Sequence, residues 1–80
     1  MSDEDILAGI QDVARIHLDW QDPLEPEMRL VEDLRLDSIR LLTLASEVEN
    51  RFRILLDELD EGAIATVGDL VSIVRRKLSE

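Results

Sequence analysis

The stretch Leu34-Arg35-Leu36-Asp37-Ser38-Ile39 decides how the rest of the chain is organised. Asp37 and Ser38 both favour the start of a helix, and apolar residues recur at helical spacing directly after them. We therefore predict a helix over residues 38–52, with Ser38 at or just inside its N-terminus and its hydroxyl facing solvent. A phosphate attached to that hydroxyl would be stabilised by free backbone N–H groups and by the positive end of the helix dipole.

The sequence on either side of this stretch also has a helical period and only a weak strand signal. An apolar stripe that follows three acidic residues predicts a helix over residues 3–19, in which Gly9 either weakens the helix or permits close approach of a neighbouring one. An acidic segment predicts a short helix within residues 57–63. Thr66 and Asp69 resemble a capping box and predict the start of the last helix.

Residues 20–37 are predicted to be a long connection, because Pro23 and Pro26 exclude a continuous helix there. A connection of this length is uncommon in a small domain unless it packs on the core or has a function. We expect it to cross the helices with several apolar side chains anchored. Those side chains are Leu24, Met28, Leu30, Val31, Leu34 and Leu36.

The composition predicts one small acidic domain spanning residues 1–80. The chain has a net charge of −10, no cysteine and one histidine. The charge argues against nucleic acid and anionic membrane surfaces and favours partners with basic docking surfaces. A disulfide framework and a metal site are not expected from so few cysteine and histidine residues. Since no apolar stretch is long enough to span a bilayer, we expect a cytoplasmic protein without membrane insertion.

The charge is spread unevenly along the chain. Residues 1–37 hold 11 acidic and 3 basic side chains, whereas residues 38–54 hold 2 acidic and 3 basic ones. The helix that begins at Ser38 is therefore predicted to be the least acidic part of the molecule.

The whole chain resembles an acyl carrier protein, most closely between residues 34 and 70. The family pattern reads roughly Leu-Gly-x-Asp-Ser-Leu, a helix ending in Phe, a link ending in Ile-Pro, an acidic helix, and Ile-x-Thr-Val. The residues that match it, in a register without gaps, are Leu34, Asp37, Ser38, Ile39, Leu42, Val48, Phe52, Leu56, Ile64, Thr66 and Val67. This set at fixed spacing is far more specific than the Asp-Ser pair alone.

The resemblance implies an all-α four-helix bundle with three long helices, a short third one, and a long loop between the first two. It also implies that Ser38 carries 4′-phosphopantetheine, transferred from coenzyme A by a phosphopantetheinyl transferase with the help of Mg²⁺, which Asp37 helps to place. Such a protein is a monomeric carrier and not an enzyme. Its arm presents acyl intermediates as thioesters to acyl-loading, condensing or transferring enzymes of fatty-acid- or polyketide-like biosynthesis.

Departures from the family pattern predict a specialised member instead of the housekeeping fatty-acid carrier. Arg35 stands where the family has Gly, and because a non-glycine residue does not freely adopt a positive φ, we expect a differently set loop. Asp57 stands where Pro is common. In the helix after Ser38, residues such as Arg40 and Arg51 occupy positions where the fatty-acid members are commonly acidic.

The candidate partner-docking residues are Ile39, Arg40, Glu47, Asp57, Glu58 and Asp60. The acidic run that contains Asp57, Glu58 and Asp60 could instead form a solvated face, and Arg40 could likewise be solvated. His17 is expected to be half-buried with a hydrogen-bonding partner, whereas Trp20 and Phe52 are expected to be packing residues.

Two other functions stay open at this point. One is a peptidyl or aminoacyl carrier of a nonribosomal-type pathway, although the Asp before Ser38 favours acyl cargo. The other, from a different class, is a small helical adaptor without any prosthetic group.

Overall fold

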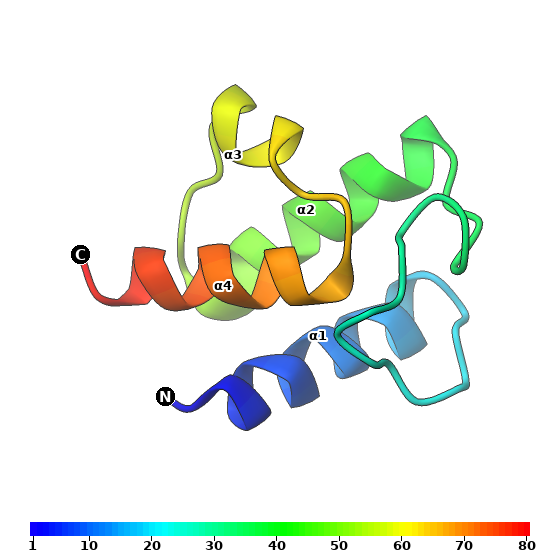
Figure 1. Ribbon diagram of the computed structural model, residues 1–80, viewed down its shortest axis with the longest axis horizontal. Helices are drawn as coiled ribbons and strands as arrows, with labels where there is room; N and C mark the ends of the chain where they lie inside the picture. Colours follow the sequence, from blue (N-terminus) through cyan, green and yellow to red (C-terminus); the bar gives the residue numbers. More distant parts are fainter.

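The computed structural model describes residues 1–80, which form four helices joined by irregular connections (Figure 1). The helices are α1 (Asp3–His17), α2 (Ser38–Phe52), α3 (Glu58–Gly62) and α4 (Val67–Leu78). This confirms the predicted all-α architecture with a short third helix and a long loop after the first. None of the four helices combines the length and the apolar character that a membrane crossing requires.

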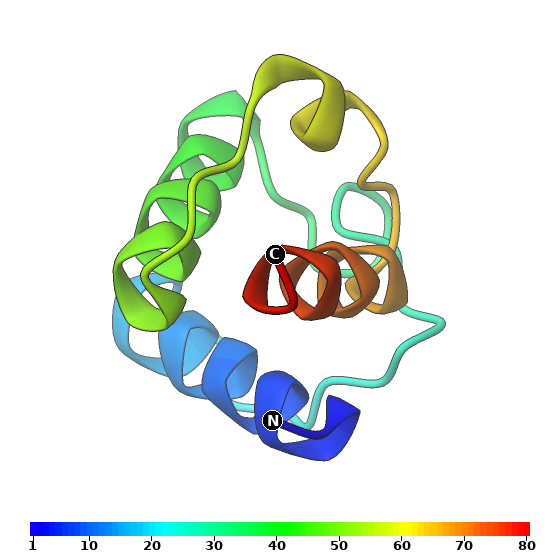
Figure 2. The ribbon, with the colours of Figure 1, turned by 90° about the vertical axis from the view of Figure 1, so that its left-hand side faces the viewer.

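Helix α4 lies at the centre of the molecule. Figure 2 shows it almost end-on, with α1, α2, α3 and the long loop arranged around it. Its apolar side faces a single core cluster of 19 buried residues, which draws on α1, α2, α4 and the connections between them. The residues that α4 contributes are Val67, Leu70, Val71, Ile73 and Val74.

The long loop between α1 and α2 is fastened at several points. The Gln11 side chain of α1 accepts the Leu24 N–H at 2.6 Å, and the Pro26 carbonyl accepts the Gly68 N–H at 2.9 Å. Four of the six apolar side chains that were expected to be anchored are buried, whereas Val31 is 59% exposed. The buried four are Leu24, Leu30, Leu34 and Leu36. The loop is thus part of the core, and it leads directly into the start of α2.

Helix α1 ends two residues earlier than the predicted range of 3–19. Asp19 has a φ of 54°, in the left-handed region, which reverses the chain direction just after the cap residue Leu18. The turn allows the Trp20 N–H to donate to the Ala14 carbonyl at 3.1 Å. The Ala14 carbonyl, which also accepts the Leu18 N–H at 3.0 Å, thus binds two donors at the end of the helix.

Gly9 of α1 lies directly against Phe52 of α2. A Cβ atom built on Gly9 would lie 2.5 Å from Cζ of the Phe52 ring, which is closer than two carbon atoms can approach. The glycine therefore allows close contact between α1 and α2, as expected. Nearby, His17 Nε2 lies 3.4 Å from Glu47 Oε1, so the histidine has the expected partner, although it is exposed and not half-buried. Trp20 is half-buried against the core, and its indole nitrogen is buried without an acceptor.

Candidate functional site

Ser38 is the first residue of α2 and is exposed to solvent. Asp37 forms the N-cap, with Oδ1 accepting the Arg40 N–H at 2.8 Å. This geometry follows from the extended backbone of Asp37, whose short side chain reaches back to the first turn. The helix begins where the sequence predicts, and the Ser38 hydroxyl is accessible at its positive end.

The first turn of α2 contains backbone N–H groups that have no acceptor within the chain. The Leu41 N–H donates to the Asp37 carbonyl at 2.9 Å, whereas the amides of Ser38 and Ile39 have no acceptor within the chain. The turn itself holds no acidic side chain, so the capping Asp37 is the carboxylate that offsets the positive end of the dipole. The surroundings of the Ser38 oxygen are therefore suited to a negatively charged group.

A pocket of about 410 Å³ opens beside Ser38, between α2 and the segment that joins α3 to α4. Seven of its nine lining residues are hydrophobic, and Ser38 and Glu61 are the two polar ones. The hydrophobic ones are Leu30, Leu41, Leu42, Leu44, Ala45, Ile64 and Leu70. A group attached to Ser38 would therefore have an apolar pocket within reach.

The backbone conformation of Arg35 contradicts the expectation of a differently set loop. It has a φ of 57°, so it adopts the positive φ that the family glycine would provide, and the loop is not set differently for lack of that glycine. Leu34 and Leu36 on either side are buried, and the Leu36 N–H donates to the Leu30 carbonyl at 3.1 Å. These contacts hold Arg35 in a conformation that costs an L-residue about 1 kcal/mol.

Replacing Arg35 by glycine is expected to stabilise the protein by about 0.5 kcal/mol. Glycine removes the steric strain of the left-handed conformation, although its more flexible unfolded chain offsets part of the gain. Urea denaturation at neutral pH measures the change. Arg35→Ala is the matched control, because it removes the guanidinium and keeps the strain. Equal stability of both variants would contradict the strain argument.

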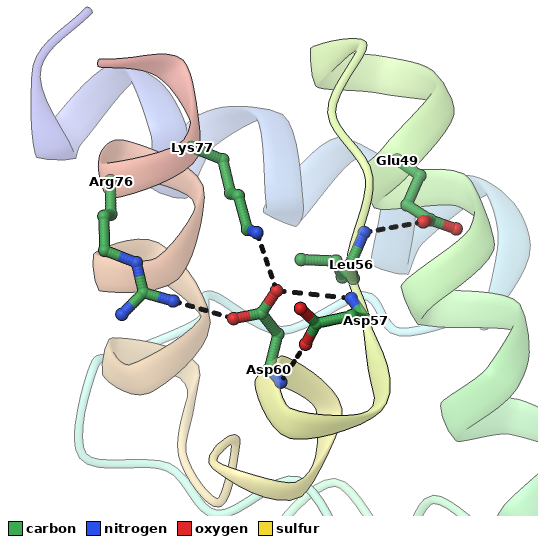
Figure 3. A network of polar contacts seen from close by, with 6 residues as sticks. All are labelled: Glu49, Leu56, Asp57, Asp60, Arg76 and Lys77. Atoms are coloured by element: carbon green, nitrogen blue, oxygen red, sulfur yellow. Dashed lines mark hydrogen bonds and ion pairs between the residues drawn. The ribbon is translucent and has the colours of Figure 1, made fainter. Parts of the chain in front are cut away.

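Asp60 of α3 is almost fully buried, at 6% exposure, and binds two cations of α4 (Figure 3). Its Oδ1 lies 2.7 Å from Arg76 Nη2, and its Oδ2 lies 2.9 Å from Lys77 Nζ. The hydrogen bond from Lys77, together with one from the Asp57 amide, lowers the pKa of Asp60, and Asp60 in turn raises the pKa of Lys77. Asp60 joins α3 to α4 and is not free to dock a partner, which corrects its place among the docking candidates.

The other docking candidates differ in their availability. Ile39 is 76% exposed, and Arg40 is also exposed, both beside Ser38. Glu47 is half-buried and faces His17. Asp57 caps α3 through its side chain, and Glu58 is exposed on the same helix. The structure thus brings Ser38, Ile39 and Arg40 together at one end of α2, away from Glu47.

Asp37 has one carboxylate oxygen left over from capping. Oδ2 makes no hydrogen bond within the chain, so a contact with a metal ion in a complex is compatible with the cap. Nowhere does a group of three or more His, Asp or Glu side chains gather to hold a metal ion.

The pocket beside Ser38 was not foreseen from the sequence. Leu44 is buried at 3% exposure, and its spacing from Val48 is that of one helix face, so the periodicity could have identified it. Leu30, Ile64 and Leu70 reach the pocket from other segments. Only the folded chain brings them to Ser38.

Known proteins with similar sequences are carriers. No protein-family profile matches the chain. The acyl carrier protein of Thermotoga maritima is 40% identical over 52 residues, which cover 65% of this chain and 64% of that protein, less than two thirds of its length. The meromycolate extension acyl carrier protein of Mycobacterium tuberculosis is 28% identical over 78 residues, which cover 95% of this chain and 67% of that protein.

A solved structure matches nearly the whole chain. It is a candidate acyl carrier protein from Mycobacterium tuberculosis, with a TM-score of 0.74 and 34% sequence identity, and the match covers 92% of this chain and 95% of that one. Since both the fold and a third of the residues agree over nearly the whole length of that relative, the chain belongs to the acyl carrier protein family.

Proposed function

We propose that the chain, as a single carrier domain, tethers acyl intermediates on a 4′-phosphopantetheine arm bound to the Ser38 oxygen. The observation that carries this proposal is the place of Ser38: it is exposed, at the first position of a capped helix, and next to two amides without acceptors. A phosphodiester at that oxygen would be stabilised by the amides and the helix dipole.

The chain's own residues would hold and present the arm. Asp37 fixes the start of α2, and the core behind α2 keeps the Ser38 oxygen on a rigid element, as a presenting site requires. When bound, the group supplies a flexible arm whose terminal thiol carries cargo as a thioester. Such an arm raises the effective concentration of cargo at each partner's active site. Catalytic groups are supplied by the partner enzymes.

The proposed cargo is an acyl chain of fatty-acid- or polyketide-like synthesis. The apolar pocket beside Ser38 suits an aliphatic group better than a charged aminoacyl group. The meromycolate extension relatives carry acyl chains of one particular pathway, as their name says. The proposed partners are a phosphopantetheinyl transferase and acyl-loading, condensing or transferring enzymes. Because coenzyme A supplies the arm, we place the carrier, as a monomer, in the cytoplasm.

Intact-mass analysis tests this function. The protein is incubated with coenzyme A, Mg²⁺ and a broad-specificity phosphopantetheinyl transferase, and we expect the mass of one arm to be added to nearly every molecule. Ser38→Ala is expected to remain unmodified. Ser46→Ala is the matched control, because Ser46 is an exposed serine of the same helix and its loss should leave modification unchanged. An unmodified wild-type protein would favour the prosthetic-group-free adaptor.

The nature of the cargo is tested separately on the modified protein. Loading with acyl groups by an acyl-transferring enzyme, and not with amino acids by adenylating enzymes of nonribosomal type, is the expected result. Aminoacyl loading alone would replace the acyl proposal by the peptidyl-carrier alternative.

A further inference from the structure

We propose that the enzymes served by this carrier dock over the outward face of α2 with an acidic surface that pairs with Arg40. This inference rests on the proposed function and adds the chemistry of the partner. It reverses the expectation, drawn from the net charge of the chain, that partners present basic surfaces.

The ion pairs of the chain single out the cations near α2. Six of the nine basic side chains bind carboxylates of the same chain. They are Arg15, Arg29, Arg51, Arg75, Arg76 and Lys77. The three that have no ion pair are Arg35, Arg40 and Arg53. In a chain with 19 carboxylates, the unpaired cations are thus confined to α2 and the residues next to it.

The carboxylates of α2 are engaged inside the molecule. Glu47 faces His17 of α1. Glu49 accepts the Leu56 N–H at 2.8 Å, as Figure 3 shows. Arg51, the other cation of α2, binds Asp12 of α1. Arg40 is therefore the one charged side chain of α2 that no contact within the chain engages, in a protein whose net charge is −10.

The guanidinium of Arg40 forms no hydrogen bond or ion pair within the chain. Arg40 is the third residue of α2, where the positive end of the dipole repels a positive charge. The Asp37 carboxylate, which caps the backbone N–H of Arg40, offsets part of this repulsion but forms no ion pair with the guanidinium. The exposed Arg40 side chain is therefore available for a contact outside the chain.

The geometry of the helix favours an outside partner for Arg40 over the proposed arm's own phosphate. Successive residues of an α-helix are about 100° apart, so the side chains of Ser38 and Arg40 leave α2 about 200° apart. Ile39 and Leu42 share the face between them, with exposures of 76% and 63%. An enzyme that reaches over this face to Ser38 would cover both apolar side chains and meet Arg40 at the edge.

The occupant that fits this face is a protein surface with an apolar centre and carboxylates at its rim. The apolar centre would contact Ile39 and Leu42, which otherwise remain in water. Rim charges of this kind act mainly on the rate of association and on its dependence on salt. The inference therefore predicts effects on KM and on ionic-strength dependence, with kcat unchanged.

Kinetics with the enzymes of the source organism test the inference. Each phosphopantetheinyl transferase and each condensing enzyme is purified and assayed with wild-type protein, Arg40→Ala and Arg40→Glu, in modified form where cargo is needed. For the cognate condensing enzyme we expect kcat/KM to fall about tenfold with Arg40→Glu and about threefold with Arg40→Ala, through KM, and the difference to shrink at 0.5 M salt.

Arg53→Glu is the matched control for net charge. Arg53 is also unpaired, but it lies at the other end of α2, about 22 Å from Ser38 at 1.5 Å per residue, and its reversal should change kcat/KM less than twofold. A carboxylate-to-lysine change on the enzyme that restores activity with Arg40→Glu would identify the pairing residue and support the inference.

The outcomes separate this inference from the proposed function. If Ser38 takes no arm, the proposed function fails before docking is measured. If Ser38 is modified but Arg40→Glu serves every enzyme as well as the wild type does, the docking inference alone is overturned. It is also overturned if Arg40→Glu changes the ³¹P shift of the attached arm and leaves kcat/KM unchanged, since Arg40 would then serve the phosphate.

Discussion

Gly9→Val is expected to leave the chain largely unfolded at 25 °C. Even one added Cβ would lie 2.5 Å from the Phe52 ring, and valine adds two further methyl groups. The ring cannot move away easily, because Phe52 is itself buried between helices at 8% exposure. Overpacking of this kind costs about 3 kcal/mol or more, which is comparable to the about 3–5 kcal/mol that a core of this size provides.

Circular dichroism and urea denaturation measure this effect. Gly62→Ala is the control, because nothing lies within 4 Å of a Cβ at Gly62 and the substitution should be neutral or slightly stabilising. Gly9→Ala should fall between the two, since its clash is partly offset by about 1 kcal/mol of helix propensity. Phe52→Leu should reduce the penalty of Gly9→Ala. A stable, fully helical Gly9→Val protein would contradict the assigned contact between α1 and α2.

Asp60→Asn is expected to lower the melting temperature by several degrees and to loosen α3 before the rest of the chain. Asparagine keeps the size of the side chain and loses the charge that binds Arg76 and Lys77 (Figure 3). Lys77 then remains largely covered, with 18% of its side chain exposed, and has lost the carboxylate that binds it directly. Glu58→Gln, an exposed neighbour on α3, is the control and should have little effect.

The pH dependence of stability provides a second test at Asp60. Its pKa is lower in the folded protein than in the unfolded chain, because the carboxylate binds Lys77 and the Asp57 amide. The contribution to stability is therefore complete above the ordinary aspartate pKa of about 3.9 and is lost as the pH falls through the lower, folded value. The melting temperatures of wild type and Asp60→Asn should differ at pH 7 and converge in acid.

Some acid dependence should persist in Asp60→Asn. Hydrogen bonds from the amides of Ala65 and Thr66 lower the pKa of Asp69 as well, and the substitution leaves that site intact. A difference in melting temperature between the two proteins that stays constant from pH 7 into strong acid would contradict the role given to Asp60.

The elements whose limits are set by neighbouring residues could be predicted from the sequence. Helix α2 begins and ends where expected, because Asp37 caps its start through a side chain three residues from Arg40. The capping box of Thr66 and Asp69 likewise fixes the start of α4. Helix α1 was predicted too long, because the left-handed turn at Asp19 has no glycine to mark it.

The parts of the site that depend on distant residues could not be predicted. Asp60 looks like a member of a solvated acidic run until α4 brings Arg76 and Lys77 to it, 16 and 17 positions along the chain. The pocket beside Ser38 combines the loop, α2, α3 and α4, and no local pattern encodes it. Arg35 shows a different limit of prediction from sequence. Packing of Leu34 and Leu36 imposes a backbone conformation that an arginine by itself disfavours.

The indole of Trp20 has a practical consequence for all of these measurements. The chain contains no tyrosine, so ultraviolet fluorescence excited at long wavelength comes from this one ring. Its buried nitrogen, which has no hydrogen-bond partner in the fold, would gain hydration on unfolding. The emission should therefore move to longer wavelength when α1 and the loop separate. The emission should stay almost unchanged while α3 alone opens. Tryptophan fluorescence and hydrogen exchange at α3 would therefore report two different events.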